Sequence, residues 1–396
     1  MAFSFSEQDP FGDLAEKSMA ESVTRHALIP TEGGWQLLLC GVDTLDLGLF
    51  VEFGSHWPLL REALDRGKEQ AQGKNGQLDQ SGKGRCFLHL PSGKPPNYRF
   101  HLQFPEYHLY LAKNPPRHSP NGYLSLGAET LWQLGIEHSL DLVLADLARF
   151  KGNVVLTLPS RIDLCADFHL PGGLSLEFLQ RLKVARSRAT AHYGHADQLE
   201  TFYCGSPSGM VRLRIYDKGK EAQKKGKAWF PHLWGRDTFT DVWRVEFQLR
   251  RPALKQFGVN TVDELRQKMG GIWEYLTGEW FSLRWKDDER QDRRSIHPWW
   301  QDVQSCAGKL GPATQVQRIF ASDLLASVDW YVSHIAGCLP SFAARLGIHD
   351  FNDALNRLGN EVTLYWFDRK YNEEFKKRSI KVGRPLDEIG GADEEE

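Results

Sequence analysis

The chain has 396 residues, 41% of them hydrophobic and 12% aromatic, so it is long enough for two domains and can bury well-formed cores. No apolar run approaches the ~20 residues of a membrane span, and the N-terminus lacks a secretory signal, so we expect a cytoplasmic protein. The six cysteines show neither C-x-x-C spacing nor a pairing rhythm, which indicates reduced thiols and argues against a disulfide scaffold.

Charge is distributed unevenly along the chain. The formal net charge is −2, but residues 387–396 carry six acidic side chains, so the rest of the chain stands at +4. Between Arg181 and Lys255 there are 16 lysines and arginines against 7 aspartates and glutamates. A basic region of this kind favours an anionic polymer such as a nucleic acid as the partner, and a solvated basic surface is the alternative.

The first part of the chain predicts a leader followed by paired strands. Residues 1–30 are polar and mixed, which indicates a flexible leader, and from Trp35 an apolar run opens a folded domain over residues 31–255. Residues 66–85 are rich in Gly, Gln, Lys and Asp and predict an exposed loop. Strand-like segments whose spacing predicts antiparallel hairpins follow at 86–90, 98–104 and 108–112.

The second part of this domain mixes helices with strands. Ser139 can cap a helix that runs to Phe150, and residues from Leu174 to about Tyr193 predict a further helix after a break at Pro171. Strands, two of them joined by a turn, are predicted at 154–158, 161–168, 200–204, 211–218 and 243–250. The pattern predicts an α+β fold, an antiparallel sheet with helices on one face.

Beyond about Pro252 the pattern becomes mainly helical. Residues 256–386 predict a helical C-terminal region, and the acidic residues 387–396 predict a disordered tail. The helices are expected at 262–276, 315–328, 330–346 and 352–377. No G-x-x-x-x-G-K-[ST] motif occurs in the chain, so neither ATPase nor helicase activity is expected.

Three of the predicted strands have one apolar face and one ionisable face. In the strand that contains Tyr216, the tyrosine alternates with apolar residues and falls on the same side as several cations. The ionisable faces of the three strands carry Arg212, Arg214, Tyr216 and Lys218; Arg161, Asp163, Cys165 and Asp167; and Arg244, Glu246, Gln248 and Arg250. If the strands pair in one sheet, these side chains meet on one face; an ordinary solvated face is the alternative.

A tyrosine beside clustered carboxylates suits phosphodiester chemistry. Asp163, Asp167 and Glu246 lie in apolar strands, where Asp is disfavoured, and they repel one another unless a cation neutralises them. Oxygen-only ligands favour Mg²⁺ or Mn²⁺, so these acids are the candidate metal ligands. Such a metal would polarise a phosphoryl oxygen while the phenolate of Tyr216 attacks.

The neighbouring cations have candidate roles in the same chemistry. A free phenol with a pKa of ~10 is a poor nucleophile at neutral pH. Arg212, Arg214 and Lys218, or the metal, can lower that pKa by stabilising the phenolate, and Arg214 and Lys218 can hold the scissile phosphate. We therefore take Tyr216, Lys218 and Arg214 as candidate catalytic residues, with candidate DNA-binding residues Arg161, Arg212, Arg244, Arg186, Arg188 and Lys220.

Short motifs in residues 35–255 resemble those of a known family. They are G-V-D-T-L at 41–45, R-I-D-L-C-A-D-F at 161–168, Y-C-G-S at 203–206, R-L-R-I-Y-D-K at 212–218 and R-V-E-F at 244–247. Their order and spacing are similar to those of the replication initiation factor family, which includes rolling-circle initiators of small plasmids and filamentous phages and relaxases of integrative elements.

The resemblance implies a DNA strand transferase. Such enzymes cut one strand at an origin through a tyrosine, keep the 5′ end as a phosphotyrosine and later rejoin the strand. It implies that Tyr216 is the nucleophile and that the metal-binding acids are Asp163, Asp167 and Glu246. The chain lacks one common feature of rolling-circle enzymes, the His-x-His metal site, because no two of its histidines are separated by a single residue.

The sequence thus predicts a metal-dependent tyrosine nickase that initiates rolling-circle replication. A non-catalytic DNA-binding regulator of replication or copy number, and a metal-dependent nuclease that uses water, are the alternatives. The expected partner is DNA, single-stranded or in a hairpin at the nick site, with no membrane. A host helicase and a homodimer are left open as further partners, as are the origin sequence and the source replicon.

Overall fold

The computed structural model describes residues 34–79, 85–114, 119–195, 198–312, 316, 328–367, 369–373 and 375. The chain divides into two compact units, residues 1–317 and 318–396. The expected leader at 1–30 and the acidic tail at 387–396 lie outside the described residues. None of the described helices has the length and apolar character needed to cross a membrane.

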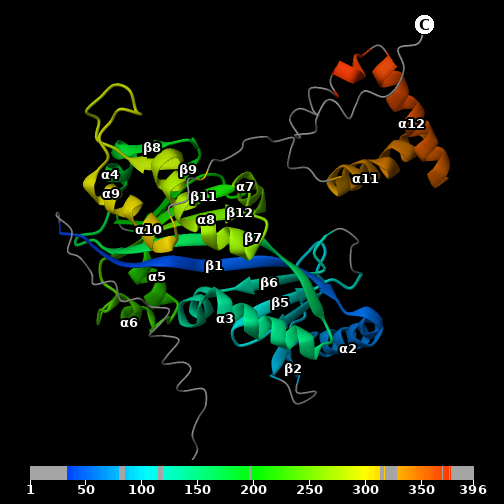
Figure 1. The fold of residues 1–396 in the computed structure, drawn as a ribbon, viewed down its shortest axis with the longest axis horizontal. Helices are drawn as coiled ribbons and strands as arrows, with labels where there is room; N and C mark the ends of the chain where they lie inside the picture. The colour runs from blue at the N-terminus through cyan, green and yellow to red at the C-terminus, as the bar shows by residue number, and fades with distance from the viewer. Residues whose placement is uncertain are drawn as a thin grey trace, which may run out of the picture. The chain divides into compact units, whose positions relative to one another are not determined.

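The first unit is built on an antiparallel sheet of 11 strands in the order β2-β3-β4-β5-β6-β1-β7-β12-β11-β10-β9 (Figure 1). The strands are β1 (Gln36–Glu52), β2 (Gln77–Asp79), β3 (Phe87–His89), β4 (Phe100–Gln103), β5 (Tyr107–Leu111), β6 (Gly122–Leu126), β7 (Asn153–His169), β9 (Thr190–His195), β10 (Gln198–Cys204), β11 (Val211–Asp217) and β12 (Val242–Arg250). The predicted antiparallel sheet is therefore confirmed.

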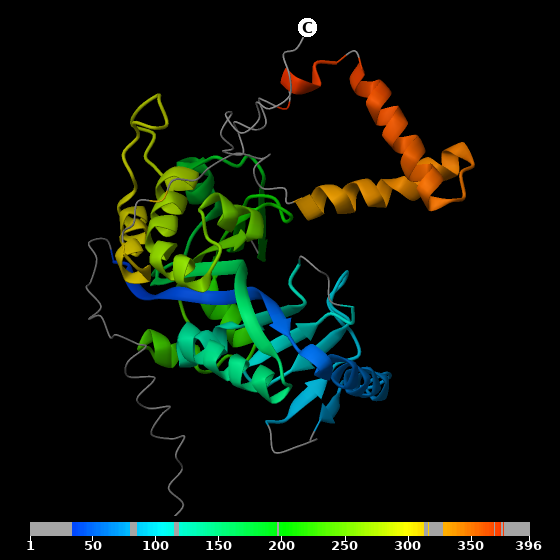
Figure 2. The same cartoon turned by 45° about the vertical axis from the view of Figure 1, so that its right-hand side comes forward.

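Two long strands at the centre of the sheet divide it into similar halves. β1 and β7 have 17 residues each and pair with one another along most of their length. β6, β5 and β4 follow beyond β1, and β12, β11 and β10 follow in the same way beyond β7. In Figure 2, β1 (blue) runs between the first half (cyan) and the second half (green). The chain therefore repeats a strand order that no repeat in its sequence reveals.

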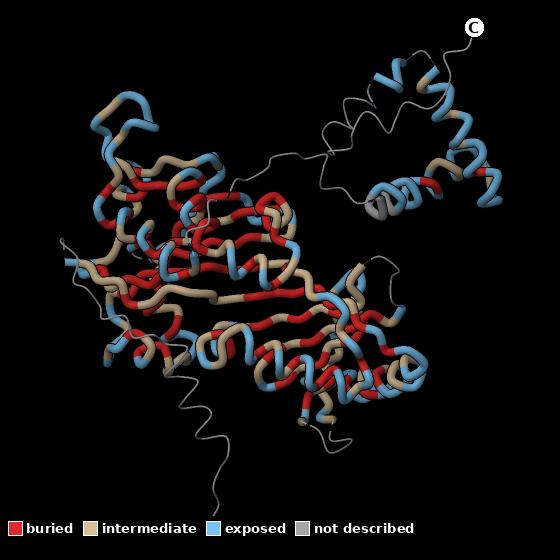
Figure 3. The backbone as a smooth tube through the Cα atoms, in the orientation of Figure 1, coloured by how far each residue is buried: buried red, intermediate tan, exposed pale blue. Residues whose placement is uncertain are grey.

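Helices cover one face of this sheet in both halves. The first half adds α2 (Trp57–Gln70) and α3 (Ala128–Arg149), and the second adds α4 (Leu176–Leu182) and α8 (Val262–Tyr275). Alternation decides which side chains face them: along β11, Val211, Leu213 and Ile215 are buried, and the residues between them are half-buried. The buried side chains of both halves form one core, which follows the sheet in Figure 3. The predicted α+β class is confirmed.

Two short helices break the expectation that helices lie on one face only. α5 (Lys218–Lys224) and α6 (Phe230–Trp234) come from the long connection between β11 and β12. Phe230 and Trp234 form a small separate cluster with Leu38 of β1 and Val242 of β12. Phe230 also lies under the guanidinium of Arg244, which belongs to the polar face. This end of the polar face is therefore covered.

The helix predicted from Leu174 to Tyr193 ends much earlier. α4 stops at Leu182, and the next residue is already extended. Residues Lys183–Ala185 form β8, which pairs with β13 (Phe281–Leu283), and β9 follows. The apolar spacing of the helix stops at Leu182, and pairing with a distant strand then determines the backbone. As a result, Arg186 and Arg188 do not lie on a helix face.

Two other helices, α3 and α2, also differ from the prediction. α3 begins at Ala128, so Ser139 lies inside it, and its hydroxyl donates to the carbonyl of Gly135, where the helix is kinked. The segment expected as a loop at 66–85 begins inside α2 and includes β2. Remaining elements of the first unit are η1 (Gly54–His56), α7 (Arg251–Gln256), η2 (Leu276–Trp280), α9 (Pro298–Ser305) and α10 (Ala307–Leu310).

The second unit contains the helices α11 (Val328–Leu346) and α12 (Phe351–Phe367). They correspond to the helices predicted at 330–346 and 352–377, whereas most of the helix expected at 315–328 lies outside the described residues. The core of the first unit includes Trp273 of α8 and Trp300 of α9. The division between the units therefore falls later than the predicted boundary after residue 255.

Candidate active site on the polar face of the sheet

Tyr216 lies beside a carboxylate on the polar face. It is the sixth residue of β11, and its hydroxyl donates to Oε2 of Glu246 at 3.0 Å. Glu246 comes from the neighbouring strand β12, where it is opposite Arg214 in the register. Because side chains two residues apart share a face, the alternation of β11 alone brings Arg214 and Tyr216 to the same carboxylate. The phenol thus has a proton acceptor within hydrogen-bond distance.

Arg214 contacts two of the three predicted carboxylates, Asp163 of β7 and Glu246 of the adjacent strand β12. Its Nη2 contacts Oδ2 of Asp163 at 3.1 Å and also Oε1 of Glu246. Arg161 binds the other side of Asp163, with Nε 2.9 Å from Oδ1. Asp163 and Glu246 are buried, whereas about a third of each arginine side chain is exposed. The arginines therefore lie between the buried acids and solvent.

Asp167 and Arg244 form a separate, fully buried ion pair. Arg244 donates to both carboxylate oxygens of Asp167, at 2.5 and 2.8 Å, and also contacts Asp43. The indole Nε1 of Trp234 in α6 donates to Asp167 as well, at 2.8 Å. We predicted Arg244 as a DNA contact, but it is 0% exposed beneath α6 and cannot reach a ligand at the surface. It holds buried carboxylates instead.

The predicted set of three metal ligands does not converge in the structure. Among the described residues, no group of three or more His, Cys, Asp or Glu side chains is placed to hold a metal ion. Asp167 is engaged by Arg244 and Trp234, as described above. Asp163 and Glu246, however, both contact the same guanidinium nitrogen of Arg214, so this pair already converges on one cationic atom. Two carboxylates around one cation fit Mg²⁺ or Mn²⁺, and Asp167 does not belong to that set.

Burial raises the pKa of Tyr216 well above its ordinary value. Arg244 and Arg214 act in the opposite direction, and Asp43 adds to the increase. Arg214 therefore lowers the pKa of this phenol, as expected, but burial outweighs that effect in the protein without substrate. At neutral pH Tyr216 is protonated, so it needs a base to become a nucleophile.

Lys218 lies behind Tyr216 and not at the surface. It is 1% exposed, its Nζ is 2.8 Å from Oε2 of Glu221, and it stacks over the rings of Phe230 at 4.4 Å and Tyr216 at 5.7 Å. Burial, followed by repulsion from Arg244, lowers its pKa to about 8. The predicted contact of Lys218 with a scissile phosphate is not supported by this placement; the residue supports the phenol ring from below.

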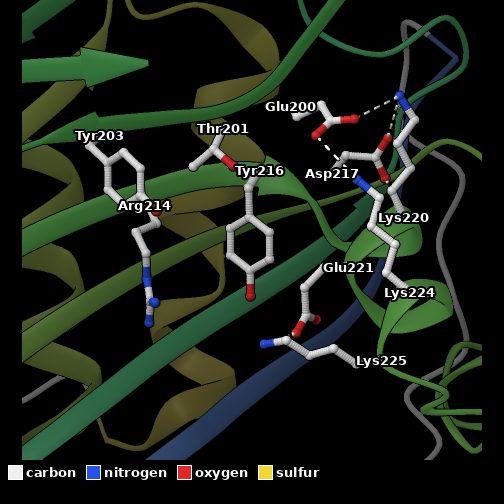
Figure 4. A pocket seen from close by; sticks show the side chains of 10 residues that line it. All are labelled: Glu200, Thr201, Tyr203, Arg214, Tyr216, Asp217, Lys220, Glu221, Lys224 and Lys225. Atoms are coloured by element: carbon white, nitrogen blue, oxygen red, sulfur yellow. Dashed lines mark hydrogen bonds and ion pairs between the residues drawn. The ribbon is translucent and has the colours of Figure 1, made fainter. Parts of the chain in front are cut away.

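An open pocket of about 310 Å³ lies on the other side of Tyr216. Figure 4 shows the ring between Arg214 on one side and Glu221 and Lys225 on the other. Its cations are Arg214, Lys220, Lys224 and Lys225, its acids are Glu200, Asp217 and Glu221, and Thr201 and Tyr203 complete the lining. Lys220 was predicted to contact DNA. Lys224 and Lys225 were missed, although the charge run in which they lie was a signal.

The other predicted DNA contacts are spread over the unit. Arg161 is on the polar face beside Asp163, and the guanidinium of Arg212 lies 4.0 Å from the ring centre of Tyr203. Arg186 forms an ion pair with Glu279 of η2, at 2.9 Å. Arg188 is exposed between β8 and β9. None of the contacts described for Arg186 joins it to the pocket of Tyr216.

Comparison with known proteins finds similarity among solved structures. No protein-family model matches the chain, and no curated protein matches it. A solved structure of a rolling circle replication initiator protein from Geobacillus stearothermophilus is similar at 17% sequence identity with a TM-score of 0.41, over 70% of this chain and 98% of that chain. The functional proposal therefore depends on the geometry of the site and on the motifs of the sequence.

Proposed function

We propose that this protein nicks one strand of DNA through Tyr216 and initiates rolling-circle replication. The observation that carries the proposal is the hydrogen bond from the Tyr216 hydroxyl to Glu246. Tyr216 also lines an open pocket that contains four cations and three acids. A buried carboxylate is a suitable base for a phenol, and the cations suit a phosphodiester backbone. The order of the motifs around Tyr216, Asp163 and Glu246 supports the same function.

The proposed reaction exchanges one ester for another. The phenolic oxygen of Tyr216 forms a bond with the scissile phosphorus, and its proton passes to Oε2 of Glu246. The bond from phosphorus to the 3′ oxygen breaks, and that oxygen takes a proton from water. The 5′ phosphate stays on the tyrosine, so attack by a 3′ hydroxyl can later rejoin the strand without ATP.

The surrounding residues orient these groups and balance charge. Arg214 holds Glu246 from one side and is exposed enough to contact a phosphate from the other. Asp163, which Arg161 binds, holds Arg214 in turn. A divalent ion between Asp163 and Glu246 would supply a Lewis acid for a phosphoryl oxygen. Lys218 keeps the ring of Tyr216 in place from the buried side.

A covalent-adduct assay tests this function. Single-stranded DNA that carries the origin, labelled on the 5′ phosphate side of the nick, is incubated with protein and Mg²⁺ or Mn²⁺ and separated on a denaturing gel. Label should migrate with the protein, and Tyr216→Phe should abolish the adduct. Tyr203→Phe, a tyrosine of the same pocket, is the matched control and should still form it.

The other outcomes of this assay identify the alternatives. Cleavage without a covalent adduct would indicate a nuclease that uses water. Binding without cleavage would indicate a regulator that only binds DNA. An adduct that persists in Tyr216→Phe and disappears in Tyr203→Phe would contradict the assignment of the nucleophile.

A further inference from the structure

The first half of the sheet carries a second polar cluster, at the position that corresponds to Tyr216. β5 and β6 form an antiparallel pair in the first half, as β11 and β12 do in the second. Tyr110 is the next-to-last residue of β5, and Tyr216 is the next-to-last residue of β11. Both tyrosines point to the polar face, because Leu109 and Leu111 beside Tyr110 and Ile215 before Tyr216 are buried in the core. The repeated strand order therefore gives the sheet two tyrosines in equivalent places.

Aromatic rings and imidazoles surround Tyr110. Nε2 of His101 is 2.9 Å from Nδ1 of His108, and the ring of His101 stacks on Tyr110 with centroids 4.1 Å apart. The Nζ of Lys94 lies over the rings of Tyr123, at 4.4 Å, and of Tyr110, at 5.4 Å. Both histidines and both tyrosines are half-buried, so their ring faces are partly open to a ligand.

This cluster does not suit a second nucleophile or a metal site. In the part of the chain that the structure describes, no carboxylate accepts a hydrogen bond from Tyr110. Asp46, the nearby acid, is buried and accepts from Tyr123 at 2.8 Å and from Ser125 at 2.6 Å. Burial lowers the pKa of His101 to about 4, so this imidazole is neutral at physiological pH. What is left is a neutral aromatic surface with a lysine beside it, which is the chemistry that binds stacked bases next to phosphates.

The cluster shares one continuous face with Tyr216. Across the centre of the sheet, Arg161 of β7 is opposite Asp46 of β1, Asp46 is opposite Ser125, and Ser125 is opposite His108. Residues directly opposite one another in paired strands lie on the same face. Arg161 in turn binds Asp163, which contacts Arg214 of the Tyr216 site. From β11 to β5 there are five strand spacings, or ~24 Å.

We propose that the Tyr110 cluster is a second binding site for the DNA strand that is cut at Tyr216. The single-stranded segment beside the scissile phosphate crosses the polar face, its bases stack on the Tyr110 and His101 rings, and Lys94 contacts its backbone. This inference rests on the proposed function, because it assigns the cluster to the same substrate. Tyr216 aligns with Leu39 of β1 through Arg244 and Asp167, and Tyr110 aligns with Gly48 of β1 through Tyr123, so the sites are also nine residues, or ~30 Å, apart along the strands. Together with the ~24 Å across the sheet this is a separation of ~38 Å, which corresponds to about eleven nucleotides at the ~3.4 Å rise of stacked DNA.

Binding of a fluorescein-labelled 20-nucleotide oligo-dT tests the proposal. The background is Tyr216→Phe, so that no covalent adduct forms. Tyr110→Leu keeps an apolar side chain without an aromatic face, and it should weaken binding about tenfold. Tyr110→Phe keeps the ring and is the matched control, which should bind within about twofold of the parent. Equal affinities for the Leu and Phe variants, with unchanged melting temperatures, would overturn the site.

Photocross-linking provides a readout that does not depend on a substitution at Tyr110. A 20-nucleotide oligo-dT that carries 5-bromodeoxyuridine is irradiated with the Tyr216→Phe protein, and the adducts are mapped by mass spectrometry. Adducts are expected on residues 101–110 as well as around β11. Adducts confined to residues 198–250 would overturn the proposal. Neither experiment requires nicking. If DNA binds at Tyr110 but the wild-type protein forms no covalent adduct, the proposed function is refuted and the second binding site is not.

Discussion

At the scale of single residues, the sequence correctly placed Tyr216 and Glu246 on one face of the sheet, although it assigned Glu246 to a metal and not to the Tyr216 hydroxyl. Alternation predicts which face of its own strand each side chain occupies, and the pairing of β11 with β12 brings the two side chains together. The partners of Asp167 could not be predicted in this way. They include Trp234, which comes from a helix in a long connection, and no period in the sequence relates such a residue to the sheet.

Replacement of the proposed base should separate catalysis from binding. Glu246→Gln keeps the size of the side chain but cannot take a proton from a phenol whose pKa burial has raised. We expect the rate of adduct formation in single-turnover experiments to fall by about 10²- to 10⁴-fold, with DNA affinity within a few fold of the wild type. Glu200→Gln, at the rim of the same pocket, is the control. A Glu246→Gln protein that forms the adduct at the normal rate would remove Glu246 from the reaction.

Lys218 should make stability rise with pH in the alkaline range. Its pKa is about 8 in the folded protein and 10.5 in the unfolded chain, so between these values the unfolded state binds more protons. The free energy of unfolding should therefore increase from pH 8 upward, by about 3 kcal/mol at most. Lys218→Met should lose this increase. Urea unfolding of both proteins at several pH values measures the difference, and parallel curves would contradict the prediction.

At the scale of elements, the strands were predicted better than the helices. Period-two patterns survive in the structure because one face of the sheet packs against the core. The helix expected at 174–193 ends at Leu182 because β8 finds a partner in β13, about a hundred residues later in the chain. Sequence periodicity cannot report a partner so distant. The same holds for α5 and α6, which are short and lack a repeating apolar pattern.

The close packing of α5 against the loop that contains Phe239 depends on Gly219. A Cβ on Gly219 would lie 1.7 Å from the carbonyl oxygen of Phe239, so Gly219→Ala forces the helix away from that loop. We expect a loss of about 1–3 kcal/mol in stability and a lower rate of adduct formation, because α5 follows Tyr216 directly. Gly127→Ala, where an added Cβ meets nothing within 4 Å, is the control. Thermal unfolding and the covalent-adduct assay check both effects, and equal behaviour of the two variants would contradict the role of α5.

At the scale of the whole molecule, the near-neutral net charge conceals a basic region around the proposed site. If Lys220, Lys224, Lys225 and Arg214 contact phosphates, each contact releases counterions. We expect the affinity for single-stranded DNA to fall steeply with salt, and Lys224→Gln with Lys225→Gln together to reduce the slope of log K against log salt by about 1–2. Titrations between 50 and 200 mM salt provide the measurement. A flat response of the wild type would argue against this pocket as the DNA contact.

The sequence indicated the class of the fold but not the arrangement of its two halves. Strand order depends on which distant segments pair, and the two halves have no visible sequence repeat. Once β1 and β7 are paired, however, the equivalence of Tyr110 and Tyr216 follows from topology. The second DNA site was proposed from that equivalence.

The pairing of β1 with β7 also has a consequence for biosynthesis. Residues 36–52 can pair only after residues 153–169 have been synthesised, more than a hundred positions later. The other edge of β7 stays unpaired until β12 has been synthesised. A nascent chain therefore emerges from the ribosome with an unsatisfied strand edge, which invites aggregation until translation has passed residue 250. Assembly of this sheet should be slow compared with that of a helical protein of equal length, because its central strand pairs, β1 with β7 and β7 with β12, are non-local.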